Sequence, residues 1–393
     1  MANTFNLGNG NWAQKTEKVL AYNAENNNYK PLPFDFDRAS TATRVNKQGL
    51  IETVATDEPR IDFLNNSKGH LLLEPQRTNL ITYSEDLTSG NKSNVTATAN
   101  TNETLDPSGN NNATKFEVTA TGADANIRTQ YTAALTDFSC FIYLKGEAGQ
   151  KFELFVARDS FTEIKTGVPV LCTGDWQKVQ LSDTFSTTST TVVVGLEFGH
   201  SSTDSVDGQV YYLWGAQLEA GSYATSYIPT SGSAVTRVDD TFNQYGWQSK
   251  GILGASAGTL FLDLRNCFSK DDTEIVYQFV DSSENPIFRL YFEQSPECSI
   301  FSVYNNINSE FVKQNFTLTS SPKIAIVYDG TSRLDIFGNG QKLTKTGGNL
   351  TSNASVDGFE DALSDNFNST SFNEIKLYNT ALTDAELIAL TTI

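Results

Sequence analysis

The chain has 393 residues, a formal net charge of −18 and a sequence pI near 4.5, with 38% hydrophobic and 19% charged residues. A polyanion would meet a repulsive field over most of such a surface, so the composition argues against nucleic-acid binding. The 25 Phe and 15 Tyr against a single Met favour β-sheet over helix. At roughly 100 to 200 residues per domain, the length predicts two or three domains.

Residues 1–15 are polar throughout and contain no apolar stretch of the kind that forms a signal-peptide core. No segment reaches the roughly 20 apolar residues that a membrane-spanning helix needs. We therefore expect synthesis in a host cytoplasm and no insertion into a membrane. The cysteines show no CxxC or Cys/His ligand spacing, which predicts buried free thiols and neither zinc nor a disulfide framework. They are Cys140, Cys172, Cys267 and Cys298.

We interpret residues 1–80 as an N-terminal attachment segment with β-character. Residues 84–115 are then dominated by Asn, Thr, Ser and Gly, which is typical of loops and short strands that open a new module. Strand-like runs follow, and two of them have apolar residues on both parities, as expected of central strands covered on both faces. Their spacing predicts a jelly roll over residues 81–234. The runs are 137–145, 151–157, 176–181, 191–198 and 209–218.

A second boundary falls in 226–237, where Pro229 and a run of small residues interrupt the strand pattern. The β-runs beyond it predict a second sandwich over residues 235–393. The one convincing helix is 382–390, with Thr383 as N-cap and Glu386 as its capping-box partner. The runs of this sandwich are 258–265, 274–280, 287–293, 299–305, 323–329, 333–340 and 372–379.

Two stretches resemble a recurrent pattern in tailed-phage structural proteins. One is FDFDRASTATRVNKQGLIETVATDEPRIDF with HLLLEPQRTNLITYSED, within 34–86, and the other is YYLWGAQLEAGSYATSYIPTSGSAVTR, 211–237. Between them the chain is similar to a carbohydrate-binding-module-like jelly roll. Residues 238–393 resemble a laminin-G/concanavalin-A-like domain through GTLFLDL, KIAIVYDGTSRLDIFGNGQKL and FNEIKLYNTALTDAELIAL. The resemblance implies an all-β fold of tandem antiparallel β-sandwiches with an N-terminal extended segment.

The same resemblance implies a bacteriophage virion protein, a head or tail fibre or a decoration component, whose sandwiches contact host-surface polysaccharide. Other virion proteins and further copies of the chain in a homo-oligomer are its implied partners, and the virion is its implied location. Such domains also serve as plain spacers, so a purely structural subunit that packs against other virion proteins stays open. A polysaccharide depolymerase is disfavoured by the short β-modules and the missing β-helix repeats.

Enzymatic chemistry finds little support in the residues. A nucleophilic triad or a histidine acid/base pair needs an imidazole, and we interpret His70 and His200 as ordinary turn or surface residues. Two carboxylates would suffice for a glycoside hydrolase, but the acidic residues match no hydrolase signature. No phosphate-binding glycine motif is present either. We therefore expect a binding protein and not an enzyme.

Glycan binding on a sandwich uses exposed aromatic rings that stack on the apolar side of a sugar. The candidates are Tyr143, Phe155 and Trp214, because they lie on predicted strands of the jelly roll. The alternative, that aromatic residues in sandwich strands belong to the core, stays open. Trp176 is assigned to the core, because it follows a turn and begins an alternating strand.

No cofactor is indicated with certainty. Oxygen ligands are abundant in DFDR (35–38) and DSVDG (204–208), which leaves a structural Ca²⁺ site open, although no exact loop signature is present.

Five arginines recur in the two phage-like stretches. Paired with carboxylates or carbonyls, their planar guanidinium groups would fix the relative placement of segments at a junction. The alternative is a set of solvated surface arginines. The residues are Arg38, Arg44, Arg60, Arg77 and Arg237.

Overall fold

The structure is a computed structural model. It describes every residue except 1–3, 16–17, 24–27, 32, 200–203, 250–251, 255, 266–273, 295–298, 306–309, 315–321, 330–332, 344–355 and 362–369. Within the described residues, antiparallel β-sheets and a single short helix make up the regular structure, which confirms the predicted all-β fold class. No helix in that part of the chain is long and apolar enough to cross a membrane.

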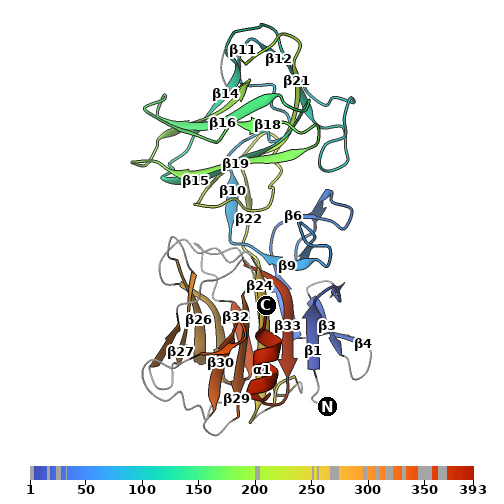
Figure 1. Ribbon diagram of the computed structural model, residues 1–393, viewed down its shortest axis with the longest axis vertical. Helices are drawn as coiled ribbons and strands as arrows, with labels where there is room; N and C mark the ends of the chain where they lie inside the picture. The colour runs from blue at the N-terminus through green and yellow to red at the C-terminus, as the bar shows by residue number, and fades with distance from the viewer. Residues whose placement is uncertain are drawn as a thin grey trace. The chain divides into compact units, whose positions relative to one another are not determined.

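The chain folds into two compact units, drawn in Figure 1. Unit 1 comprises Met1–Gly49, Thr53–Gln76 and Val238–Ile393, and unit 2 comprises Leu50–Glu52 and Arg77–Arg237. The end of unit 2 falls within the predicted second boundary. The first 76 residues differ from the prediction, because most of them belong to the unit that the C-terminal half builds and do not form a segment of their own.

The strands of unit 1 run over both ends of the chain. They are β1 (Thr4–Gly8), β2 (Ala13–Lys15), β3 (Lys18–Asn23), β4 (Asn28–Pro31), β5 (Pro33–Asp37), β6 (Ala42–Val45), β8 (Arg60–Asp62), β9 (His70–Leu73), β23 (Thr241–Tyr245), β24 (Gly258–Arg265), β25 (Glu274–Val280), β26 (Pro286–Gln294), β27 (Ser299–Asn305), β28 (Glu310–Gln314), β29 (Lys323–Tyr328), β30 (Leu334–Gly338), β31 (Gln341–Lys342), β32 (Gly358–Asp361) and β33 (Thr370–Tyr378). The short strand β7 (Ile51–Val54) lies across the division between the units in sequence.

The N-terminal strands are built into unit 1 by hydrogen bonding to distant strands. β1 and β9 both pair with β33, and β5 pairs with β23. Their inward side chains join the same core, where the rings of Phe34 and Phe242 stack with centroids 4.3 Å apart. Because these partners lie from about 200 to more than 350 residues away in sequence, the local pattern of residues 1–80 could predict strands but not their partners.

The core of unit 1 lies between two layers of one folded sheet. Leu260 and Leu262 of β24 face this core, together with Tyr277 and Phe279 of β25. The opposite face of β24 is covered by α1 (Asp384–Thr391), which packs on β29 and β30 as Figure 1 shows. The helix begins with the predicted capping box of Thr383 and Glu386, which is confirmed.

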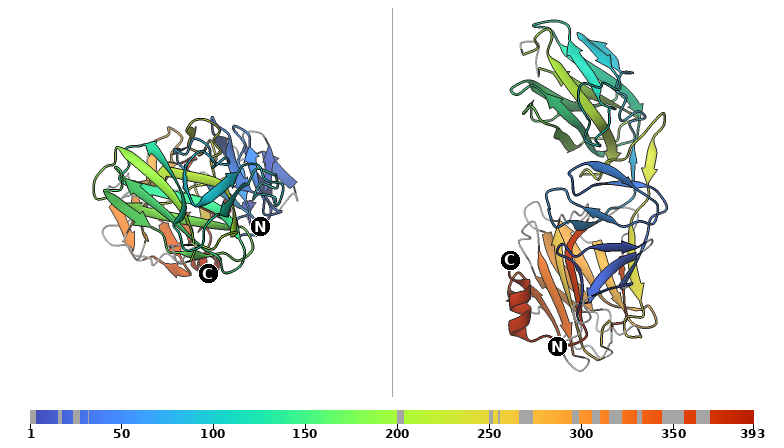
Figure 2. Two further views of the ribbon diagram at one scale, coloured as in Figure 1. Left: turned by 90° about the horizontal axis from the view of Figure 1, so that it is seen from above. Right: turned by 90° about the vertical axis from the view of Figure 1, so that its right-hand side faces the viewer.

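Unit 2 is a sandwich of a five-stranded and a six-stranded antiparallel sheet around one core (Figure 2). In the five-stranded sheet the order is β12 (Val95–Thr98), β13 (Thr114–Val118), β21 (Val210–Ala220), β15 (Asp137–Gly146) and β19 (Gln177–Thr184). In the six-stranded sheet it is β11 (Asn91–Ser93), β14 (Ala125–Thr132), β20 (Thr191–Phe198), β16 (Lys151–Arg158) and β17 (Glu163–Thr166), with β18 (Val170–Leu171) beside β16. The strands β10 (Arg77–Asn79) and β22 (Val235–Arg237), which come from the two ends of the 77–237 segment in sequence, pair with each other.

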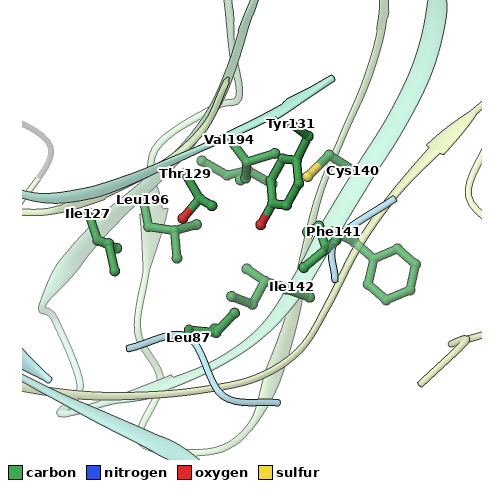
Figure 3. A pocket seen from close by; sticks show the side chains of 12 residues that line it. Leu87, Ile127, Thr129, Tyr131, Cys140, Phe141, Ile142, Val194 and Leu196 are labelled. Atoms are coloured by element: carbon green, nitrogen blue, oxygen red, sulfur yellow. The ribbon is translucent and has the colours of Figure 1, made fainter. Parts of the chain in front are cut away.

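The core of unit 2 contains two free thiols, Cys140 and Cys172, both buried. Burial raises the pKa of Cys172 to about 11 and that of Cys140 further. Cys140 lines an internal cavity of about 20 Å³, into which the hydroxyl groups of Thr129 and Tyr131 point (Figure 3). A space of this size holds one water molecule. Cys267, Cys298 and His200 lie outside the described residues.

Buried arginines hold the parts of each unit together, as the paired alternative predicts. In unit 1, Arg60 donates to Glu74 Oε2 at 2.7 Å and to Asp240, and Arg38 donates to Asp240 Oδ1 at 3.1 Å. Burial lowers the pKa of Arg60, but the carboxylates of Asp240 and Glu74 outweigh it and raise the pKa above its usual value. In unit 2, Arg237 donates to Ser226 Oγ at 2.9 Å.

Two single-residue expectations are corrected. His70 is buried at the start of β9, where burial and Arg265 lower its pKa to about 4, and is not a surface residue. Trp176 is half-buried outside the hydrophobic cores, and its Nε1 donates to the carbonyl of Leu105 at 2.8 Å. In both cases contacts with residues distant in sequence determine how far the side chain is buried, and the local sequence does not show those contacts.

Candidate functional site

Two of the three predicted glycan-stacking residues lie together on the five-stranded sheet of unit 2. The ring centroids of Tyr143 and Trp214 are 5.7 Å apart, and those of Tyr227 and Trp214 are 4.6 Å apart. Trp214 is only 1% exposed and Tyr143 is half-buried. A ring without an accessible face cannot stack on a sugar, so the prediction for Trp214 is corrected, and the core interpretation describes it.

A second chain segment covers this sheet and explains the burial. Ile228 N–H donates to Gln217 Oε1 at 2.7 Å, and Gln217 Nε2 donates to the carbonyl of Ser226 at 3.2 Å. Gly215 has φ +66°, and the register of β15 with β21 shifts at this point. The bulge and the covering segment turn the outer side of β21 into interior surface.

The third predicted residue, Phe155, lies on the outer face of the six-stranded sheet and is 6% exposed. Its ring lies across Gly195 of the neighbouring strand, where a Cβ atom would be 1.9 Å from the ring carbon Cζ. Only glycine leaves room for the ring at this position. Phe155 is therefore buried at the outer face of the sheet and offers no exposed ring face for a sugar, which corrects its prediction as a stacking residue.

The strand register places Arg128 of β14 directly beside Gly195 and thus next to Phe155. The guanidinium carbon of Arg128 lies 5.7 Å from the ring centroid of Phe155 and 5.4 Å from that of Phe161. A guanidinium group at this distance is attracted to the faces of both rings. The two rings also contact each other, with centroids 6.3 Å apart, so the guanidinium group and the two rings form one cluster.

Phe161 is positioned by the turn that follows β16. Asp159, Ser160 and Phe161 have φ of 45°, 57° and 67°, a left-handed conformation that costs non-glycine residues of order 1 kcal/mol or more each. Asp159 Oδ1 stabilises the turn by accepting from the N–H groups of Thr190 at 2.8 Å and Thr191 at 3.1 Å. These bonds, with Thr190 first, lower the pKa of Asp159 to about 2. The turn holds the Phe161 ring 39% exposed.

Arg128 makes no hydrogen bond to any residue that the structure describes, and its Nε is buried without a partner. A buried unsatisfied donor costs roughly 1–3 kcal/mol. A row of polar side chains lies next to it, where Asn126, Glu197 and Glu153 are register neighbours on three adjacent strands. We call the surface formed by Asn126, Arg128, Glu153, Phe155, Phe161 and Glu197 the Arg128 face.

The Arg128 face combines the exposed ring of Phe161 and the half-buried guanidinium group of Arg128 with three polar side chains, of which Asn126 and Glu153 are buried and Glu197 is half-buried. An aromatic ring binds the apolar side of a sugar, and the donors and acceptors around it bind hydroxyl or carboxylate groups. Among the described residues, no three or more His, Cys, Asp or Glu side chains lie together in a group that could hold a metal ion. In the two loops considered for Ca²⁺, Asp35 accepts from Gln244 and Asp204 pairs with Lys151.

Sequence analysis missed Arg128 and Phe161. The segment ANIRTQYT, 125–132, alternates apolar with polar residues, a period-2 signal for a strand with one outward polar face. Phe161 is a large apolar residue in the mostly polar segment RDSFTEIK, 158–165, but single exposed apolar residues are common on protein surfaces and do not by themselves indicate a site. Both features are visible in the sequence, but only the strand register of β14, β20 and β16 shows that Arg128 and Phe161 lie close together.

No protein-family model and no curated protein matches the chain. Among solved structures, the chain is similar to the CBM40 of the Ruminococcus gnavus IT-sialidase bound to α2,3-sialyllactose, with 15% identity and a TM-score of 0.27 over 37% of this chain and 86% of that one. It is similar to TmCBM61 in complex with β-1,4-galactotriose, with 15% identity and a TM-score of 0.26 over 37% and 88%. It is also similar to the binding domain of botulinum neurotoxin DC in complex with SialylT, with 12% identity and a TM-score of 0.29 over 39% of each chain.

Proposed function

We propose that the chain is a glycan-binding protein of a tailed-phage virion surface and that the Arg128 face binds the glycan. The observation that carries the proposal is the pairing of Arg128 with Phe161. The structure holds an exposed ring over a guanidinium group that has no hydrogen-bond partner among the described residues, and it does so with a strained turn. A saccharide would accept hydrogen bonds from the Nη groups of Arg128, since Nε is buried, and would cover the ring of Phe161.

The virion context of the proposal rests on the sequence pattern of residues 34–86 and 211–237. Single sites of this kind bind weakly, because one exposed ring and one cation contribute little once the freedom lost on binding is subtracted. Display of many copies on one particle would raise the apparent affinity by several orders of magnitude. A virion surface offers that multivalency.

One feature of the Arg128 face favours a second candidate, a glycoside hydrolase. Glu153 and Glu197 are register neighbours on β16 and β20, and such neighbours have Cβ atoms about 5 Å apart, close to the separation of carboxyl groups in retaining glycosidases. However, both side chains leave the same side of one sheet, whereas glycosidase carboxylates flank the scissile bond. We therefore propose binding without cleavage.

The experiment incubates the protein, displayed multivalently on beads, with a panel of bacterial capsules and lipopolysaccharides and follows both retention and new reducing ends. We expect retention of at least one glycan and no reducing ends. Phe161→Ala should reduce retention about tenfold, which corresponds to roughly 1.4 kcal/mol. Val168→Ala is the matched control, because Val168 is an exposed apolar residue of the loop after β17.

Each of the other possible results would support a different function or a different site. Reducing ends that disappear in Glu153→Gln would establish the hydrolase and overturn binding without cleavage. Retention that Phe161→Ala leaves unchanged would move the site away from the Arg128 face. Neither retention nor cleavage across the whole panel would favour the purely structural virion subunit.

A further inference from the structure

Unit 1 contains a polar pocket at an irregularity of β33. In the pairing of β24 with β33, Asp263 faces Glu374 while the next residue, Leu264, faces Phe372, so Asn373 is left without a ladder partner. The carbonyl of Asn373 instead accepts the N–H of Asn9 at 2.8 Å. Bulges of this kind re-aim side chains and are frequent beside functional sites.

The end of β1 fits tightly around this bulge. A Cβ atom at Gly8, whose φ is +102°, would lie 2.2 Å from the carbonyl oxygen of Asn373. The next residue, Asn9, also has a left-handed backbone, with φ 50°. The turn after β1 is thus shaped to bring Asn9 to the mouth of the pocket.

Amide groups line the inner part of the pocket in a connected network. Asn373 Nδ2 donates to Asp263 Oδ1 at 3.0 Å, and Asn66 Nδ2 donates to Asn373 Oδ1 at 3.0 Å. These bonds fix the orientation of the amides and leave the second oxygen of Asp263 for another donor. Burial raises the pKa of Asp263 above its usual value, as expected for a carboxyl group at the floor of a pocket.

Two cations stand at the rim with most of their donors unused. Lys68 Nζ donates to Asn9 Oδ1 at 2.6 Å, and Arg265 Nη1 donates to the carbonyl of Asn65 at 3.3 Å. An ammonium group has three donors and a guanidinium group five, and the structure shows no other hydrogen bond from either to a described residue. The chain as a whole has a net charge of −18, but in this pocket the two cations Lys68 and Arg265 outnumber the single carboxylate of Asp263. The pocket is therefore a local site for an anion.

We infer that this pocket binds a carboxylate-bearing sugar residue, such as a uronic acid, with the carboxylate at Lys68 and Arg265 and the hydroxyl groups at Asn373 and Asp263. Its volume of about 280 Å³ lies near the lower end of small-molecule sites, which begin at roughly 300 Å³, and suits one sugar residue. The site uses no residue of the Arg128 face. The inference about this pocket is therefore independent of the proposed function of the Arg128 face.

The experiment uses the full chain carrying Arg128→Gln and Phe161→Ala, so that the Arg128 face contributes nothing, and titrates it with methyl galacturonide, methyl galactoside and inorganic phosphate. We expect the uronide to bind at least tenfold more tightly than the other two. Adding Lys68→Gln with Arg265→Gln should weaken uronide binding at least tenfold without lowering the melting temperature. Lys47→Gln is the matched control, since Lys47 is an exposed cation of unit 1 outside the pocket.

Three results would overturn the inference. Equal binding of uronide and galactoside would remove the role of the two cations. Phosphate binding as tight as uronide binding would show an anion site with no recognition of the sugar. Uronide binding that survives Lys68→Gln with Arg265→Gln, or no binding of the uronide at all, would place no acidic sugar in this pocket.

Discussion

In unit 1 the guanidinium group of Arg60 pairs with the carboxylates of Glu74 and Asp240, whereas in unit 2 that of Arg128 lies against the rings of Phe155 and Phe161. Arg60 is fully buried and paired with two carboxylates, whereas Arg128 is half-buried and makes no hydrogen bond to a residue in the described part of the chain. Arginine pairing of the first kind fixes segments in place. An arginine that contacts rings and makes no hydrogen bond to a described residue is the pattern that we propose for a ligand-binding arginine.

This difference predicts opposite consequences for stability. Arg60→Met should lower the free energy of unfolding by about 3–5 kcal/mol, because it removes the cation that pairs with buried Glu74 and one of the two arginines that pair with buried Asp240. Chemical denaturation followed by tryptophan fluorescence measures the loss. Arg128→Met is the matched control and should change stability by less than about 1 kcal/mol. Equal losses of unfolding free energy in the two variants would contradict the distinction between Arg60 as a structural arginine and Arg128 as a ligand-binding one.

The burial of His70 should also make unit 1 sensitive to acid. The pKa of His70 is about 4 in the folded chain, below its ordinary value near 6.5. Above pH 6.5 the residue is neutral in both states and has no effect. As the pH falls from 6.5 to 4, only the unfolded state gains a proton, so folding stability should decrease by up to about 3 kcal/mol. Thermal melting at a series of pH values measures this, and His70→Gln should flatten the dependence across that window.

The packing of the Arg128 face can be tested through Gly195. Gly195→Ala should destabilise unit 2 by about 1–3 kcal/mol, because the new methyl group meets the Phe155 ring at 1.9 Å. In a Phe155→Ala background the same change should cost much less, since the ring is gone. A double-mutant cycle of unfolding free energies gives the difference. Additive effects would mean that the ring of Phe155 does not lie on Gly195.

Much of the fold could be predicted from local sequence. The predicted runs 258–265, 274–280, 299–305 and 191–198 coincide with β24, β25, β27 and β20, because strand-forming residues there are bounded by turn residues. The capping box of Thr383 and Glu386 was predictable for the same reason. These features depend on neighbours in sequence.

What failed depends on distant contacts. Trp214 was expected to be exposed, but the bulge at Gly215 and the segment around Tyr227 bury it. The strands of residues 1–80 find their partners in β23 and β33. The Arg128 face needs Arg128, Gly195 and Phe155 in one row across three strands, and no local pattern specifies that register.

The most direct test of the glycan-binding account compares Arg128→Ala with the unaltered chain in a single titration of the retained glycan, with the melting temperature recorded on the same samples. The account predicts at least a tenfold rise in Kd, because charge-assisted hydrogen bonds of this type contribute about 1.5–3 kcal/mol, and a melting temperature that does not fall. An unchanged Kd, or a weakened one accompanied by a loss of the fold, would show that Arg128 serves unit 2 itself and not a ligand.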